Sequence, residues 1–205
     1  MKLDRGYLIV FEGIDGTGKS THCQLLGDYL ESKGAPVRRL FEPTKGTWGM
    51  KIRKLLTEGR GDVGPEEELS WFMNDRKEDV ENNIKPSMAN NNIVILDRYY
   101  YSTAAYQGAL GLDPLRICRE NEAFAPKPDL VFLFTTSPEK CLERIQKSRP
   151  EQSTFERLDY LQKVQGIFDS LNDSIIRRID TAPPLEEVHE ILRAEVTALI
   201  FGQDK

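Results

Sequence analysis

Residues Gly13 to Ser20 read GIDGTGKS, which is the spacing of a phosphate-binding loop. In such a loop successive backbone N–H groups point inward at phosphate oxygens, and glycines allow the backbone angles that this requires. Lys19 is expected to reach the β- and γ-phosphates of a nucleoside triphosphate, and the Ser20 hydroxyl is expected to bind Mg²⁺. The loop alone does not indicate whether the phosphate goes to water or to a second substrate.

Asp15 places a carboxylate inside this loop. Like charges repel strongly in a pocket of low dielectric constant, so Asp15 is not expected to face the triphosphate. We expect it to accept a hydrogen bond from a neutral group such as a sugar hydroxyl. The alternative is a loop acid that is simply solvated.

Three further segments carry side chains suited to a second substrate. Phe72 and Arg76 lie four residues apart on a predicted helix, so a ring that could stack on a base shares a face with a guanidinium. On spacing alone, Phe72 could equally be a core residue and Arg76 a surface charge. Asp97 ends an apolar strand and could bind the water shell of Mg²⁺, and Arg98 follows it directly. A polar stretch farther along carries the basic residues Arg144, Lys147 and Arg149.

The elements that must position these residues alternate along the chain. Short apolar runs predict strands at Tyr7–Phe11, Val37–Phe41, Ile93–Asp97, Asp129–Phe134 and Ile175–Asp180. Amphipathic stretches predict helices from about Lys19 to Lys33, around Met50–Leu56, from Pro65 onward, and at Leu185–Ile200. This alternation predicts an α/β fold with one five-stranded parallel sheet covered on both faces. We find no repeat or linker, so residues 1–205 are expected to form a single domain.

Composition narrows the functional classes. The net charge of -5 argues against sequence-independent nucleic-acid binding, which needs a large basic surface. The three cysteines are scattered and predict neither a disulfide framework nor a zinc site. No apolar stretch is long enough to predict a membrane span, and no signal peptide is evident, so a cytoplasmic protein without membrane or nucleic-acid partners is expected.

Taken together, these residues resemble the thymidylate kinases, a family of the nucleoside monophosphate kinase group of P-loop kinases. The resemblance runs nearly end to end, through LIVFEGIDGTGKST, LLTEG, FMNDR, ILDRYYYSTAAYQG, PKPDLVFLF and FERLDYLQKV. Its most specific part is the aspartate–arginine–tyrosine segment with S-x-x-A-Y-Q-G. The resemblance implies the P-loop nucleotide kinase architecture, a homodimer, and Mg²⁺-dependent transfer of the γ-phosphate of ATP to dTMP, which gives dTDP.

The resemblance also implies a role for each matching position. Asp15 would hold the 3'-hydroxyl of dTMP, Arg98 its phosphate, and the Tyr106 ring would disfavour a 2'-hydroxyl. Phe72 would stack on thymine and Arg76 would contact the base. The implied dTMP-binding residues are Asp15, Glu42, Pro43, Lys45, Phe72, Arg76, Arg98, Ser102, Tyr106 and Gln107. The implied ATP-binding residues are Gly13, Ile14, Asp15, Gly16, Thr17, Gly18, Lys19, Ser20 and Thr21, with Ser20 and Asp97 at the metal.

One position departs from a branch of the family. Gly16 stands where that branch carries a loop arginine, whereas the other branch supplies the catalytic arginine from a mobile lid. We therefore expect a lid around residues 144–156, with Arg149 as the first choice of catalytic arginine and Arg144 as the second. The implied catalytic residues are Lys19, Arg98, Arg149, Arg144 and Asp15.

Three alternatives stay open. The chain could be a kinase for another nucleoside monophosphate or for a deoxynucleoside. It could instead be a P-loop ATPase that works as a switch and hydrolyses ATP without an acceptor. A nucleotide-binding module without catalysis is disfavoured, because Lys19, Ser20, Asp97 and the basic stretch are all present.

The lid assignment predicts the behaviour of one variant. Arg149→Ala is expected to lower kcat by orders of magnitude while dTMP affinity changes less, because the lost cation acts on charge that develops in the transition state. Steady-state kinetics with dTMP and ATP would measure both effects. A variant that keeps its turnover would show that Arg149 is not the lid cation.

Overall fold

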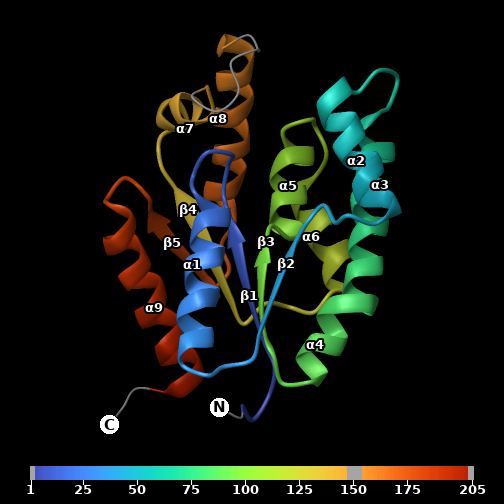
Figure 1. The fold of residues 1–205 in the computed structure, drawn as a ribbon. Helices are drawn as coiled ribbons and strands as arrows, with labels where there is room; N and C mark the ends of the chain where they lie inside the picture. Colours follow the sequence, from blue (N-terminus) through green and yellow to red (C-terminus); the bar gives the residue numbers. More distant parts are fainter. Residues whose placement is uncertain (1–2, 147–153, 203–205) are drawn as a thin grey trace.

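The computed structural model describes residues 3–146 and 154–202, and the side chains of residues 3–145 and 158–202. Its centre is a parallel sheet in the order β2-β3-β1-β4-β5 (Figure 1). The strands are β1 (Tyr7–Glu12), β2 (Val37–Phe41), β3 (Ile93–Asp97), β4 (Leu130–Thr135) and β5 (Ile176–Asp180). Strand β1 is central and pairs in parallel with both β3 and β4.

Helices cover both faces of the sheet (Figure 1). The helices are α1 (Lys19–Ser32), α2 (Thr47–Glu58), α3 (Pro65–Asp79), the π-helix η1 (Val80–Ile84), α4 (Lys85–Ala89), α5 (Tyr100–Gly108), α6 (Pro114–Glu122), α7 (Pro138–Gln146), α8 (Thr154–Ser170) and α9 (Leu185–Phe201). Helices α1 and α9 pack on one face, and apolar residues of α3, η1, α5, α6, α7 and α8 pack against the other.

The strand sequences explain these two layers. Successive side chains of a strand point to opposite faces, and strand β1 sends Leu8 and Val10 to one core and Ile9 and Phe11 to the other. All four side chains are fully buried. Because a covered parallel sheet has no wet face, its strands are continuous apolar runs rather than alternating ones.

The predicted five-stranded parallel sheet is confirmed, with differences at element ends. Strand β1 extends one residue past the predicted end, to Glu12. The helix expected around Met50–Leu56 spans Thr47–Glu58. The helix that begins at Pro65 continues through a π-helical turn as far as Ala89. Within the described residues no helix combines the length and the apolar character needed to cross a membrane.

The sheet gathers the polar residues at one edge. Because parallel strands all end at the same edge, the segments that follow β1, β2 and β3 meet there, beside the first turns of α1 and α5 (Figure 1). Ligands of open α/β sheets bind outside the carboxyl ends of the strands.

The core on the α1 and α9 side generates a stability prediction. The ring of Phe132 is fully buried and lies 5.3 Å from the ring of Phe11. Phe132→Ala is expected to lower the free energy of unfolding by about 3–5 kcal/mol, measured by urea denaturation, because it removes buried area and leaves a cavity. Leu115→Ala is the matched control: Leu115 is 61% exposed, and surface changes of this kind stay within about 0.5 kcal/mol. Equal losses in the two variants would contradict the packing described here.

Candidate active site

The phosphate-binding loop joins the end of β1 to the start of α1. Gly13 and Gly16 have φ angles of +130° and +87°, which side chains rarely allow. A Cβ atom would lie 2.5 Å from the Phe134 carbonyl oxygen at Gly13, and 2.6 Å from the Cys141 carbonyl oxygen at Gly16. Both positions therefore require glycine. In particular, the backbone of α7 occupies the space that a loop arginine at position 16 would need.

Lys19 lies within the loop. Its ammonium donates hydrogen bonds to the Ile14 carbonyl oxygen at 2.8 Å and to the Thr17 hydroxyl at 3.4 Å. Burial lowers the pKa of Lys19 to about 8, and the neighbouring Arg98 acts in the same direction. Nearby carboxylates, including Asp15, oppose this shift. A buried ammonium at the positive end of α1 creates a site for a multiply charged anion.

The Ser20 hydroxyl and the Asp97 carboxylate lie close together. The Ser20 hydroxyl donates a hydrogen bond of 2.5 Å to Asp97 Oδ2. Hydroxyl and carboxylate oxygens suit Mg²⁺, which keeps several waters and takes its other ligands from substrate phosphates. Among the described residues there is no cluster of three or more histidine, cysteine or acidic side chains that could hold a metal by itself. The donor set thus fits a cation that is bound together with a nucleotide.

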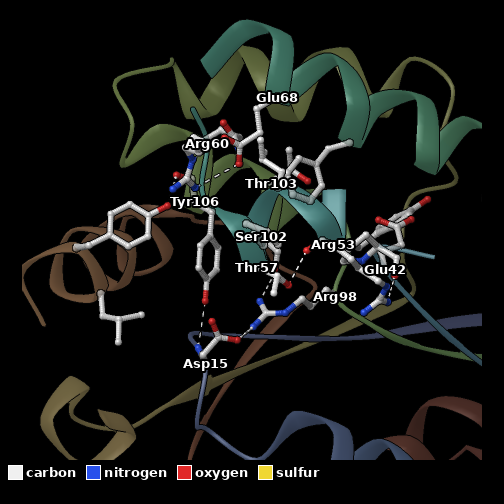
Figure 2. A pocket seen from close by; sticks show the side chains of 18 of the residues that line it. Asp15, Glu42, Arg53, Thr57, Arg60, Glu68, Arg98, Ser102, Thr103 and Tyr106 are labelled. Carbon is white, nitrogen blue, oxygen red and sulfur yellow. Dashed lines mark hydrogen bonds and ion pairs between the residues drawn. The ribbon is translucent and has the colours of Figure 1, made fainter. Parts of the chain in front are cut away.

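Arg98 is the cation beside the loop (Figure 2). Its guanidinium donates to Asp15 Oδ1 at 2.6 Å, to the Ser102 hydroxyl at 2.8 Å and to the Gly13 carbonyl oxygen at 3.2 Å. It also lies over the Tyr106 ring, 5.2 Å from the ring centroid. These contacts fix the direction of the guanidinium.

Asp15 pairs with a cation of the protein itself. Desolvation would raise the pKa of its carboxyl, but the Arg98 and Lys19 cations outweigh that effect and hold the pKa below its ordinary value. Within the chain, the Asp15 carboxylate pairs with the Arg98 guanidinium, whereas the expected bond to a neutral group such as a sugar hydroxyl stays a prediction. The Asp15 side chain remains 54% exposed, so it can accept a further hydrogen bond from a ligand.

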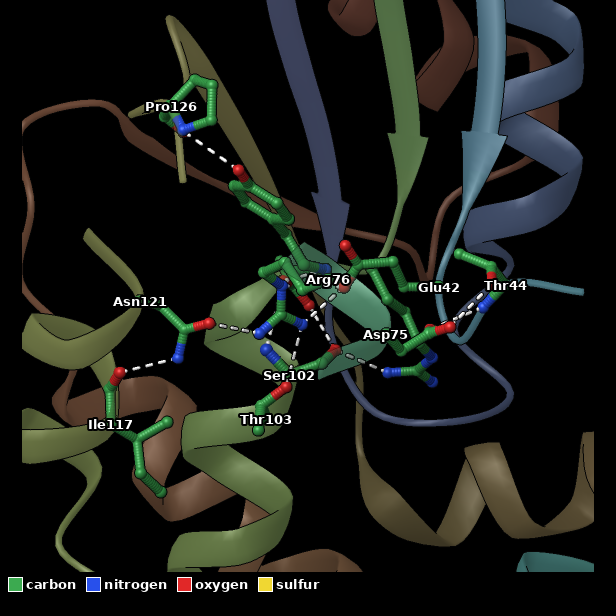
Figure 3. A network of polar contacts seen from close by, with 12 residues as sticks. Glu42, Thr44, Asp75, Arg76, Ser102, Thr103, Ile117, Asn121 and Pro126 are labelled. Atoms are coloured by element: carbon green, nitrogen blue, oxygen red, sulfur yellow. Dashed lines mark hydrogen bonds and ion pairs between the residues drawn. The ribbon is translucent and has the colours of Figure 1, made fainter. Parts of the chain in front are cut away.

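Arg76 lies in a buried polar network (Figure 3). Its Nε and one terminal nitrogen donate to Glu42 Oε2 at 2.9 and 2.5 Å. The same guanidinium donates to Asn121 Oδ1 at 2.6 Å and to the Thr103 hydroxyl at 3.0 Å. Burial raises the pKa of Glu42 to about 8, against the opposing effect of Arg76. The surface role that spacing left open for Arg76 is thereby excluded, since its side chain is 2% exposed.

Two cavities, of about 1020 and 1080 Å³, open at this edge of the sheet. Figure 2 shows the first of them. The residues that line both are Asp15, Gly16, Ser20, Glu42, Pro43, Arg53 and Arg98. The first cavity also contains the predicted acceptor residues Phe72, Arg76, Ser102, Tyr106 and Gln107. The second also contains Lys45, Lys19, Thr21 and Asp97. The ten predicted acceptor residues and most of the predicted donor residues are thus brought to two adjoining spaces, and Arg98 lines both. Gly13, Ile14 and Thr17 line neither cavity.

Several residues that line this site were not predicted from the sequence. Arg53 on α2 lines both cavities, and its guanidinium donates to the carbonyl oxygens of Pro43 and Thr44. The buried Glu68 carboxylate accepts from Arg60 at 2.7 Å and from the Gln107 amide at 2.9 Å. Arg53, Arg60 and Glu68 stand in no recognisable motif, so only the fold reveals them.

The predicted lid is described only at its two ends. Arg149 and Lys147 lie outside the described residues. Arg144, at the end of α7, donates to the Gly16 carbonyl oxygen at 3.3 Å and to the Thr181 carbonyl oxygen at 3.2 Å. It therefore connects the phosphate-binding loop with the turn that follows β5, and it lines the first cavity.

Comparisons with known proteins match this chain to one family over nearly its whole length. The family model described as thymidylate kinase matches residues 11–192. A thymidylate kinase of Desulfotalea psychrophila is 45% identical over 201 residues, which cover 98% of each chain. A probable thymidylate kinase of Archaeoglobus fulgidus is 42% identical over 94% of this chain and 96% of its own. A thymidylate kinase of Akkermansia muciniphila is 46% identical over 90% of this chain and 88% of its own.

The Arg76–Glu42 pair generates a stability prediction. Arg76→Met is expected to lower the free energy of unfolding by about 3–5 kcal/mol in urea denaturation, because it leaves the Glu42 carboxylate buried without its cation. Adding Glu42→Gln to this variant should recover part of the loss, since no buried charge then remains.

The exposed pair Arg116–Glu66 provides the control. Its side chains are 36% and 64% exposed, so Arg116→Met should leave the urea midpoint nearly unchanged. An equally small effect of Arg76→Met, or no recovery in the double variant, would contradict the interpretation of the buried pair.

Proposed function

The chain belongs to the thymidylate kinase family, and we infer from this membership that it is an ATP-dependent kinase that phosphorylates dTMP to dTDP. The observation that best supports this function in the structure is the arrangement of the two cavities, which adjoin at Arg98 and share Asp15. A kinase must hold two phosphorylated substrates against each other, whereas an ATPase switch needs only one.

For the donor side, we propose that the loop amides and Lys19 hold the triphosphate of ATP. Phosphoryl transfer needs little covalent help from the protein, because alignment and charge stabilisation supply most of the acceleration. Ser20 and Asp97 would hold Mg²⁺, which when bound neutralises charge on the triphosphate oxygens. The short contact between these two side chains supports their assignment to one site.

For the acceptor side, Arg98 aims the phosphate of dTMP at the donor. Its contacts with Asp15, Gly13 and Ser102 leave guanidinium N–H groups for a phosphate, because an arginine carries five donors. Arg53, which also lines both cavities, adds positive charge for the same phosphate. The exposed carboxylate of Asp15 accepts the 3'-hydroxyl of the sugar.

For the base, Phe72 provides the stacking ring and Arg76 a hydrogen-bond donor. Both line the first cavity, and the network around Arg76 holds its guanidinium in one orientation. A fixed donor favours a base that presents a carbonyl oxygen, as thymine does. The ring of Tyr106 stands at the wall of the same cavity and disfavours a 2'-hydroxyl.

The lid of residues 144–156 supplies the remaining positive charge. The close approach of the Cys141 carbonyl oxygen to Gly16 supports this proposal, because it excludes a loop arginine. Arg149 is the proposed catalytic arginine, and Arg144 supports the loop through the Gly16 carbonyl oxygen. A homodimer, which rests on the family resemblance, and the cytoplasmic residence expected from the sequence complete the proposal.

An acceptor panel tests the function. With ATP and Mg²⁺, dTMP is expected to give the highest kcat/KM, ahead of dUMP, dCMP, dGMP and thymidine, with formation of the diphosphate followed by chromatography. EDTA should abolish the reaction and added Mg²⁺ should restore it. Preference for another nucleotide or for thymidine would point to a different kinase. Dominant ATP hydrolysis without any acceptor would point to an ATPase switch.

A further inference from the structure

Glu12 is a buried carboxylate that the proposed function does not use. It is the last residue of β1, directly before the phosphate-binding loop, and it is fully buried. Its Oε1 accepts hydrogen bonds from the backbone N–H groups of Tyr99 at 2.9 Å and Ser102 at 3.1 Å. Its Oε2 accepts a hydrogen bond from the Ser102 hydroxyl. Arg98 lines both cavities, whereas Glu12 lines neither of them.

These contacts cap a helix from another part of the chain. The first N–H groups of a helix lack partners within the helix, and a side chain just before the helix often accepts from them. Tyr99 precedes α5 and makes no such contact through its own side chain. Glu12 accepts the Tyr99 and Ser102 N–H groups instead, and its negative charge suits the positive end of α5. The carboxylate thus joins the end of β1 to the start of α5.

The same contacts determine the backbone conformation of Arg98. This residue has a φ of +71°, in the left-handed region that non-glycine residues seldom adopt. Its own N–H donates to the Phe11 carbonyl oxygen at 3.0 Å, and the next N–H, of Tyr99, donates to Glu12. Two neighbouring residues of β1 therefore hold the two peptide groups on either side of Arg98.

Glu12 also determines the polarity of the contact that holds the Arg98 side chain. A hydroxyl has one proton to donate, and the Ser102 hydroxyl donates it to Glu12. Its oxygen is then free to accept from the Arg98 guanidinium at 2.8 Å. If the Ser102 proton pointed toward Arg98, two donors would face each other.

We propose that Glu12 is a positioning residue for phosphoryl transfer, which fixes the Arg98 guanidinium between the two cavities through the α5 N-terminus and the Ser102 hydroxyl. This inference rests on the proposed function, in which Arg98 binds the acceptor phosphate. Because Glu12 directly precedes the donor loop, one strand end sets the positions of both substrates relative to each other. Burial raises the pKa of Glu12 to about 7, against the opposing effects of the Ser102 hydrogen bonds and the Arg98 charge, so keeping a carboxylate at this position costs desolvation energy.

The test variant is Glu12→Gln. Glutamine keeps the size and one acceptor oxygen, but its amide group donates to the Ser102 hydroxyl. The hydrogen bond between residue 12 and Ser102 is then reversed, and the Ser102 proton loses the acceptor that directs it away from Arg98. We expect kcat/KM for dTMP to fall by about tenfold to a hundredfold, as for a small misplacement of a binding group. The KM for ATP should stay within about twofold, because the loop amides and Lys19 are unchanged.

Asp129→Asn is the matched control. Asp129 holds the other end of β1, where its carboxylate accepts from the Leu8 N–H at 2.8 Å and pairs with Arg5. It lines neither cavity. This variant should lower Tm without a selective loss of kcat/KM for dTMP. The double variant Glu12→Gln/Ser102→Ala should lose less activity than the product of the two single-variant losses. Both substitutions break the same connection, which runs from Glu12 through Ser102 to Arg98.

Two results would overturn the proposal. One is a wild-type kcat/KM for dTMP in Glu12→Gln. The other is a loss of kcat/KM for dTMP that comes with an equal rise in the KM for ATP and with a fall in Tm like that of Asp129→Asn. If Glu12→Gln does not fold, Glu12→Asp serves instead: it keeps the charge at α5 but is too short for all three contacts, and the same selective loss is expected. Failure of the wild-type chain to phosphorylate dTMP would refute the proposed function, whereas a wild-type kinase with an unaffected Glu12→Gln would refute only the positioning role.

Discussion

The ion pair between Arg98 and Asp15 is the interaction on which the rest of the site depends. A site for two phosphorylated substrates needs positive charge at the point where their phosphates meet, and that charge must not move. Arg98 lines both cavities, where the proposed function places this charge, and its direction is set by Asp15, Ser102 and the Gly13 carbonyl oxygen. The carboxylate inside the phosphate loop, which seemed unfavourable beside a triphosphate, has a physical reason in this pairing.

The buried charges in the wall of the first cavity also have partners of opposite sign. Arg76 is paired with Glu42, and the buried Glu68 is paired with the half-exposed Arg60. A buried charge without a partner costs several kcal/mol, on the order of the margin by which a domain is stable. The buried charges in the wall of this cavity are therefore paired, whereas the Glu42 Oε1 and Gln107 Oε1 atoms are buried without a hydrogen-bond partner among the described residues.

The phosphate loop is also constrained from the side of α7. The Cys141 carbonyl oxygen comes so close to Gly16 that no side chain fits at this position. Arg144, one turn farther along α7, donates to the carbonyl oxygen of the same glycine. Backbone packing thus excludes a side chain, and with it a positive charge, at position 16 of the loop.

The sequence by itself determined the alternation of strands and helices, the phosphate loop and the set of residues around it, because these depend on local spacing. Ten predicted acceptor residues, from Asp15 to Gln107, line one cavity or the other. What only the tertiary structure decided is which side chains around the site form hydrogen bonds and ion pairs with one another. Arg98 and Asp15 are 83 residues apart, Glu12 and Tyr99 are 87 apart, and Arg76 and Asn121 are 45 apart. Periodicity describes one element at a time, whereas these contacts arise where separate strands end at one edge of the sheet, so no local pattern contains them.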